Sequence, residues 1–152
     1  MALLATKLFF PISRPNFVNR SRLVEKLDSG LRGPLTLISA PAGSGKTSLM
    51  AEWREGPGKN RQVSWLSLDP ADNDLLRFLT YLTAALEYAA PDLTRPTTTL
   101  LQMPQMPPLE VIIDSLFEAL NTLSVDLILV LDDYHLLTNL QIHELLERLL
   151  SH

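Results

Sequence analysis

The chain has 152 residues, of which 46% are hydrophobic and 20% are charged, and it contains no cysteine. This composition is typical of a globular protein with one domain, and it excludes the disordered, fibrous and disulfide-rich classes. No apolar run approaches the ~20 residues of a membrane span, and the N-terminus carries no signal-peptide pattern. We expect a cytoplasmic protein whose histidines, His135, His143 and His152, lack the spacing of metal ligands.

Charge is distributed unevenly along the chain, although the net charge is only −4. Residues 1–61 hold ten Lys and Arg against four Asp and Glu, whereas residues 62–152 hold three against thirteen. The basic first part could bind an anionic ligand or could be an ordinary solvated surface. The acidic remainder argues against nucleic-acid binding by this segment, because that binding depends on clustered Lys and Arg.

The first part of the chain predicts an irregular segment, a helix, a strand and a second helix. Residues 1–20 contain Pro11 and Pro15 and are expected to be irregular. Helical spacing of apolar residues predicts a helix over residues 21–31. Residues 35–39 are apolar and predict a strand, and residues 48–53 predict a helix, so that the intervening loop connects a strand to a helix N-terminus.

That loop, residues 40–47, reads Ala-Pro-Ala-Gly-Ser-Gly-Lys-Thr. It matches the phosphate-binding pattern G-x-x-x-x-G-K-[ST] except that Ala40 replaces the first glycine. In such a loop the backbone N–H groups surround the β-phosphate, Lys46 contacts the β- and γ-phosphates, and the Thr47 hydroxyl binds Mg²⁺. The following helix directs the positive end of its dipole at the phosphates. We therefore expect ATP or GTP to be bound by Ala42, Gly43, Ser44, Gly45, Lys46, Thr47 and Ser48, the alternative being a glycine turn with a solvated lysine.

The middle of the chain predicts a strand, two amphipathic helices and a loop between them. Residues 63–68 alternate as a strand, which Asp69 and Pro70 end. A helix is expected to begin at Asp72 or Asn73 as its N-cap and to stop at Pro91. The five prolines in residues 91–108 predict a loop, and residues 109–123 predict the second helix.

The last part of the chain predicts a buried strand that delivers two carboxylates. Residues 127–131 are continuously apolar, as expected for a strand covered on both faces of a parallel sheet, and Asp132 and Asp133 come directly after them. Residues 139–150 predict a final helix. The alternation of strands and helices indicates an α/β fold with three layers and a parallel sheet.

Asp132 and Asp133 are candidates for the second half of a nucleotide site, a Walker B element. Ligands of open α/β sheets bind at the carboxyl ends of the strands. There Asp132 would hold Mg²⁺ through water, facing Thr47, and Asp133 would orient or deprotonate an attacking water. The alternative is that the two aspartates only end a strand and cap the next element of the chain.

Together with the phosphate loop, several segments resemble the N-terminal ATPase domain of MalT-like regulators, which are large ATP-binding LuxR-type transcription activators in the STAND class of P-loop ATPases. Trp-Leu-Ser-Leu-Asp at residues 65–69 and Asp-Asp-Tyr-His at residues 132–135 recur in that family in this order. The other similar segments are residues 6–8, 18–23, 35–47, 72–74 and 78–86.

The resemblance implies an AAA/STAND-like fold in which residues 43–47 hold the phosphates of ATP or ADP, Asp132 serves the Mg²⁺, and Asp133 is the hydrolytic acid. Val18 and Arg20 resemble residues near the base or ribose. It also implies a switch in which ADP is exchanged for ATP when an inducer binds elsewhere. The regulator then self-associates and contacts DNA through a C-terminal helix-turn-helix that this chain lacks.

Three departures from the family pattern concern Ser44, where a bulkier residue is common, Pro70, where an acidic residue is usual, and the length of the chain. Family members are many times longer, and they place a later strand between the phosphate-loop strand and the Walker B strand. We therefore expect residues 21–152 to be a partial, C-terminally incomplete P-loop NTPase domain, with a gap or an exposed edge at the centre of its sheet.

Three functions remain open. The first is a nucleotide-gated signalling module with slow or absent hydrolysis. The second is a small phosphotransferase, which needs lid arginines, although Arg148 is the sole arginine after Arg95. The third is an inactive remnant. The absence of a guanine-reading motif favours adenine.

Overall fold

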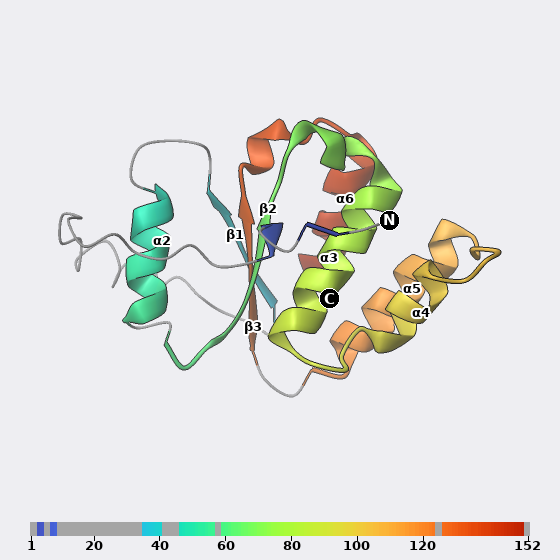
Figure 1. Ribbon diagram of the computed structural model, residues 1–152, viewed down its shortest axis with the longest axis horizontal. Coiled ribbons are helices and arrows are strands. Elements are labelled where there is room, and N and C mark those ends of the chain that lie inside the picture. The colour runs from blue at the N-terminus through green and yellow to red at the C-terminus, as the bar shows by residue number, and fades with distance from the viewer. Residues whose placement is uncertain are drawn as a thin grey trace.

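The computed structural model describes residues 3–4, 7–8, 35–40, 46–56, 59–123 and 126–150. The predicted helix over residues 21–31, most of the predicted irregular segment and the glycine-bearing part of the loop lie outside these residues. The described part is a mixed α/β structure, as the sequence predicts (Figure 1).

Within the described residues, three parallel strands form the sheet in the order β1-β3-β2. They are β1 (Leu35–Ala40), β2 (Gln62–Ser67) and β3 (Leu127–Asp132), each within one or two residues of its predicted place. Residues 127–131 of the central strand are all buried, which confirms the prediction from its continuous apolar run.

The expectation of a gap at the centre of the sheet is wrong for the described residues. β1 and β3 pair directly, from Leu35 opposite Leu127 to Ala40 opposite Asp132. The physical reason is that a buried strand such as β3 has N–H and C=O groups on both edges that need partners. β1 satisfies one edge and β2 the other, so the two edges of the central strand are paired along six residues each.

Helices cover both faces of this sheet (Figure 1). The apolar side chains of β3 point alternately to one face and the other, so both faces need a covering layer. On one face, helix α2 (Lys46–Glu55) packs Met50 and Trp53 against Trp65 of β2 and against Ile128 and Val130 of β3. On the other face, Leu127, Leu129 and Leu131 join a larger core with helices α3 (Leu75–Ala89), α5 (Leu109–Asn121) and α6 (Leu140–Leu150).

The predicted loop over residues 91–108 is partly wrong, since it contains helix α4 (Arg95–Leu101). Pro96 lies in the first turn, where a proline removes no intrahelical hydrogen bond. The helix is supported by side chains as well: the hydroxyls of Thr98 and Thr99 donate to the carbonyls of Thr94 and Arg95 at 3.1 Å and 3.0 Å. Proline content alone therefore misleads where prolines fall at helix starts.

The predicted N-cap of α3 is also wrong. A 3-10 turn, η2 (Pro70–Asn73), lies between β2 and α3, and Asp69 caps it through a hydrogen bond from the Ala71 N–H. Asp74 caps α3 instead, accepting from the Arg77 N–H at 3.0 Å. Consecutive acidic and amide residues offered several equivalent caps, and the extra turn moved the start of the helix by one or two positions.

None of the helices in the described ranges has the length and hydropathy that a membrane crossing requires.

Candidate functional site

At the carboxyl edge of the sheet, the strand that leads into the predicted phosphate loop ends beside the strand that carries Asp132. Ala40, the last residue of β1, lies opposite Asp132, which lies opposite Ser67 of β2. Neighbouring strands are about 4.8 Å apart. The segment that leaves β1 toward the predicted phosphate loop therefore begins beside the strand end that carries Asp132. The same edge faces the start of α2 at the top of Figure 1.

Helix α2 begins at Lys46, so Lys46, Thr47 and Ser48 form its first turn. The N–H groups of a first helical turn have no intrahelical partner and favour anions. Trp53, which is fully buried against β2 and β3, fixes the helix to the sheet. The described backbone thus has a strand before the predicted phosphate loop and a helix after it.

The remaining predicted nucleotide contacts lie outside the described residues, and their roles stay predictions: Ala42, Gly43, Ser44, Gly45, Val18 and Arg20.

Asp132 and Asp133 are both partly exposed at this edge. Burial, and secondly the charge of Asp133, raise the pKa of the Asp132 carboxyl above its ordinary value. The backbone of Asp132 is fixed by the sheet and by the Leu68 N–H, which donates to its carbonyl at 3.0 Å. Two carboxylates held this close repel each other, and a bound cation would relieve that repulsion.

Asp133 has a left-handed backbone, with φ 62° and ψ 35°. Aspartate tolerates this conformation better than most residues. The 3-10 turn η3 (Tyr134–Leu136) comes next, and within the described structure the Asp133 side chain makes no capping hydrogen bond to it. This observation counts against the alternative in which the second aspartate only caps the next element.

An amide that the sequence patterns did not reveal connects the turns after β2 and β3. The Asn73 Nδ2 donates to the Leu136 carbonyl at 3.0 Å, and its Oδ1 accepts from the N–H groups of Thr138 at 2.6 Å and Asn139 at 3.1 Å. Asn139 returns a hydrogen bond from its Nδ2 to the Asn73 carbonyl at 2.7 Å. The sequence indicated Asn73 only as a possible helix cap, because its partners are more than 60 positions away along the chain.

An ionic cluster of the buried Lys7 and Asp72 with the partly exposed Asp69 and Arg77 was not predicted from the sequence for the same reason. The Lys7 ammonium lies 2.7 Å from Asp69 Oδ2 and 2.6 Å from Asp72 Oδ2. The Arg77 Nε lies 3.0 Å from Asp72 Oδ1, and both cations lie over the ring of Tyr81. The hydrogen bond from Lys7 is the main cause that lowers the pKa of the Asp69 carboxyl. The cluster fixes the turn η2, and therefore Asn73, relative to α3.

Comparison with known proteins finds similar sequences that cover almost the whole chain. Over 150 residues, 99% of the chain, it is 41% identical to the HTH-type transcriptional regulator MalT of Yersinia pestis (strain Pestoides F) and to that of Serratia proteamaculans (strain 568). The similarity to these MalT regulators extends over almost the entire length of the chain. The chain spans 16% of the length of these relatives. No model of a protein family matches the chain.

The oxygen donors of Asp132 and Asp133 fit Mg²⁺ bound together with a phosphate chain. Mg²⁺ prefers oxygen ligands and is usually held by one or two carboxylates, by substrate phosphates and by water. Asp132 and Asp133 offer such carboxylates where β1 leads into the phosphate-loop sequence. Among the residues with described positions, no three His, Cys, Asp or Glu side chains gather as a separate metal site.

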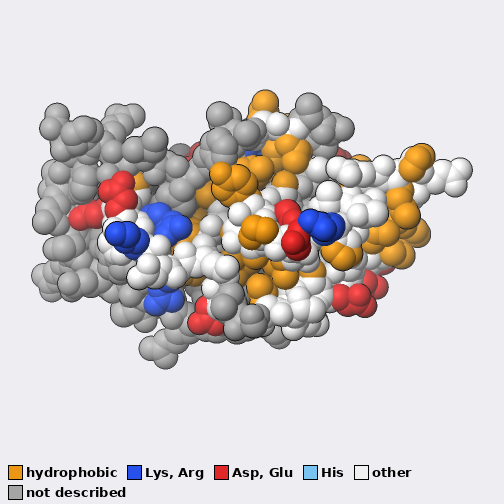
Figure 2. All heavy atoms as spheres, turned by 60° about the horizontal axis from the view of Figure 1, so that its bottom comes forward, with side chains coloured by type: hydrophobic (Ala, Val, Ile, Leu, Met, Phe, Trp, Pro, Cys, Tyr) orange, Lys and Arg blue, Asp and Glu red, His pale blue; other side chains and the backbone are white. Residues whose placement is uncertain are grey.

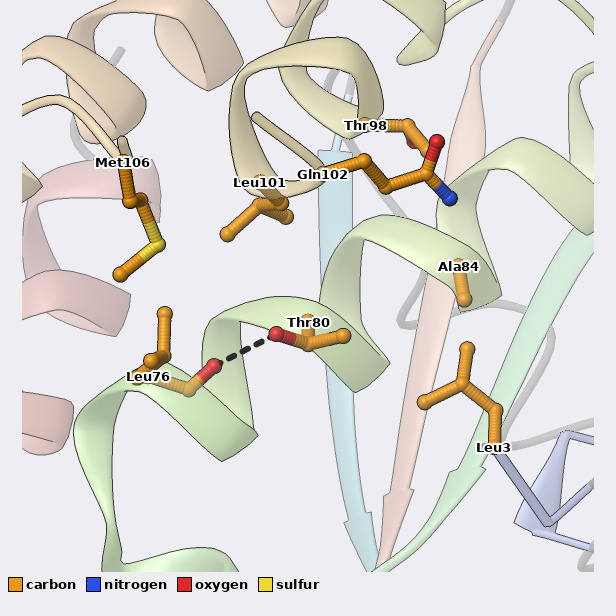
Figure 3. A pocket seen from close by; sticks show the side chains of 8 residues that line it. All are labelled: Leu3, Leu76, Thr80, Ala84, Thr98, Leu101, Gln102 and Met106. Carbon is orange, nitrogen blue, oxygen red and sulfur yellow. Dashed lines mark hydrogen bonds between the residues drawn. The ribbon is translucent and has the colours of Figure 1, made fainter. Parts of the chain in front are cut away.

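A hollow of about 240 Å³ lies between α3 and α4 (Figure 3). Two hydroxyls in it are used by their own helices, since Thr80 donates to the Leu76 carbonyl at 2.8 Å and Thr98 to that of Thr94 at 3.1 Å. Figure 2 shows hydrophobic side chains spread over the middle and the right-hand side of the face it presents. Met106, one of the residues that line the hollow, is exposed. The hollow is thus mainly apolar and includes neither aspartate of the carboxyl edge.

Proposed function

We propose that this chain is the nucleotide-binding module of a MalT-like transcriptional regulator, and that it binds ADP and ATP with Mg²⁺ at the carboxyl edge of its sheet. The observation that carries the proposal is the register of β1 and β3, with Ala40 opposite Asp132. That register puts the start of a phosphate-loop sequence beside a partly buried carboxylate. The similarity to regulators named MalT supports the same conclusion.

In this proposal the chain adopts an AAA/STAND-like P-loop fold, and its own residues divide the work of binding. The N-terminus of α2 and Lys46 receive the negative charge of the phosphates. Asp132, through water, and the Thr47 hydroxyl would hold Mg²⁺, which would screen that negative charge. Asp133 is the group that would orient a water or accept its proton. Since it would act alone in this role, we expect hydrolysis to be slow at most unless further groups complete the site.

The physiological role that we propose is a switch between ADP-bound and ATP-bound states. A switch needs binding free energy that differs between two conformations, and the γ-phosphate can supply it through Lys46 and Mg²⁺. DNA binding and self-association would then involve parts of a regulator other than the module described here. The phosphotransferase alternative gains no support, because Arg148 lies over the ring of Phe117 with 4.8 Å between the guanidinium carbon and the ring centre.

Calorimetric titration tests the proposal. The native chain is titrated with ADP, ATP and GTP at millimolar Mg²⁺, alongside Lys46→Ala and the matched control Lys59→Ala, which removes an exposed lysine in the turn before β2. We expect ADP and ATP to bind the native chain and the control, and Lys46→Ala to weaken binding by at least tenfold. Binding that survives in Lys46→Ala would contradict a site at the start of α2.

A further inference from the structure

We propose that Asn73 is a positioning residue for the Asp132–Asp133 turn, and that it sets how strongly nucleotide binding depends on Mg²⁺. The inference rests on the proposed function. Asn73 lies in η2, outside the phosphate-loop sequence and outside the acidic pair, and it would act only through the backbone that carries Asp133.

The Asn73 amide uses its full hydrogen-bonding capacity. Its two N–H groups donate to the carbonyls of Pro70 and Leu136, each at 3.0 Å. Its oxygen accepts from two backbone N–H groups, those of Thr138 and Asn139. An amide offers two donors and one oxygen with two lone pairs, so all four positions are occupied. These partners fix the orientation of the amide, because a flipped group would direct N–H against N–H and oxygen against carbonyl.

The acidic turn is therefore held at both of its ends. At the first end, Asp132 is paired to Ala40 and Ser67 in the sheet. At the other end, Asn73 binds Leu136 and Thr138, and the Leu136 N–H donates to the Asp133 carbonyl at 3.0 Å. Asp133 lies between these two anchors in a left-handed conformation, which persists where the surrounding structure enforces it.

A further contact on the same turn limits how much the loss of Asn73 should loosen it. The Nε2 of His143 contacts the Leu137 carbonyl at 3.0 Å, and because a carbonyl only accepts, Nε2 carries the proton. The Nδ1 of the same ring contacts the Tyr134 hydroxyl. Loss of Asn73 should thus loosen the turn without releasing it entirely.

The support of Asn73 comes from outside the site. η2 is closed by a capping box between Asp69 and Asp72, and the buried Asp72 carboxylate is paired with Lys7 and Arg77. The ionic cluster thus holds the turn that carries Asn73, and with it the hydrogen bonds that Asn73 makes to the residues after β3. Partners that orient metal ligands in this way typically change metal affinity 10- to 100-fold when they are mutated.

The test compares Asn73→Ala and Asn73→Asp with a matched control, Asn121→Ala, which removes an exposed asparagine at the end of α5. The first measurement is amide hydrogen exchange without any ligand. We expect the N–H groups of Thr138 and Asn139 to exchange at least tenfold faster in Asn73→Ala. Asn73→Asp keeps the accepting oxygen and should retain part of the protection, and the control should match the native chain.

The second measurement is the ratio of the ADP dissociation constant in EDTA to that at millimolar Mg²⁺. A variant that is merely less folded raises both constants by the same factor, so this ratio does not change. If Asn73 positions the acidic turn, the ratio falls about tenfold in Asn73→Ala and less in Asn73→Asp.

Unchanged exchange at Thr138 and Asn139, or faster exchange with an unchanged Mg²⁺ ratio, would overturn the inference while leaving the proposed function intact. No nucleotide binding by the native chain, with or without Mg²⁺, would overturn both. The exchange measurement, which uses no nucleotide, would then still report whether Asn73 orders the turn.

Discussion

Replacing Lys7 by methionine should destabilise the fold far more than removal of an ordinary lysine. Lys7 is 7% exposed as a residue, and its ammonium lies within hydrogen-bonding distance of two carboxylates, of which that of Asp72 is fully buried. Methionine retains most of the apolar stem but leaves Asp72 with less compensation for its buried charge.

The magnitude depends on the partners that Asp72 keeps. Removal of one partner of a buried ion pair costs about 3–5 kcal/mol when the other charge is left uncompensated. Asp72 retains the Arg77 Nε at 3.0 Å and the Asp69 N–H at 2.9 Å, so its charge is partly satisfied. We therefore expect a loss of about 2–3 kcal/mol in the free energy of unfolding. For a domain of this size the loss lowers Tm by roughly 5–10 °C.

Urea unfolding followed by circular dichroism measures this loss, with Lys59→Met as the matched control. Lys59 is exposed, so its replacement should change the free energy of unfolding by less than about 0.5 kcal/mol. Combining Lys7→Met with Asp72→Asn should recover part of the loss, because a neutral amide replaces the buried carboxylate. A Lys7→Met variant as stable as Lys59→Met would refute the reasoning.

Three further predictions concern charge and packing. Asp132→Asn should stabilise the nucleotide-free chain at pH 7 by about 0.5–1 kcal/mol in a thermal melt, because burial and Asp133 disfavour the charged form; a lower Tm would contradict this. The raised pKa of Asp132 in the fold also means that the stability from this group falls as pH rises from its unfolded pKa to its folded pKa. The lowered pKa of Asp69 has the opposite effect on stability. The stability that Asp69 contributes is fully present above its unfolded pKa, near pH 4, and is lost as the pH falls through its lower folded pKa. As the pH is lowered from 6 to 3, the urea midpoint should therefore fall more steeply in the native chain than in Lys7→Met. Parallel plots of the midpoint against pH would argue that the Lys7–Asp69 contact is not the origin of this dependence. Trp53→Ala should cost about 3–5 kcal/mol by urea unfolding, because the side chain is fully buried between α2 and the sheet, and a loss under 1 kcal/mol would contradict that packing.

The sequence predicted most elements because their patterns are local. The continuous apolar run before Asp132 is typical of a strand covered on both faces, and β3 is buried along that run. Helical spacing likewise predicted α3, α5 and α6. The place of both aspartates at the carboxyl edge is a consequence of the same run.

The features that the sequence did not predict depend on contacts between distant segments. No local pattern shows that Asn73 would bind residues after β3, or that Lys7 would enter a cluster with η2. The order of the strands could not be predicted from local sequence either. The direct pairing of β1 with β3 depends on which strand edges in the chain need hydrogen-bond partners. Helix α4 was missed because proline was treated as a helix breaker without regard to its position in the first turn.

The central claim, that the start of α2 and the acidic pair form one Mg²⁺-nucleotide site, is tested most directly by paramagnetic NMR. Mn²⁺ replaces Mg²⁺ in the ADP-bound chain, and the amide signals that broaden report which residues lie near the metal. We predict broadening at Lys46, Thr47, Asp132 and Asp133 together, while the signal of the exposed Asn121 is unchanged. Broadening at only one of the two segments, or at neither, would contradict the account.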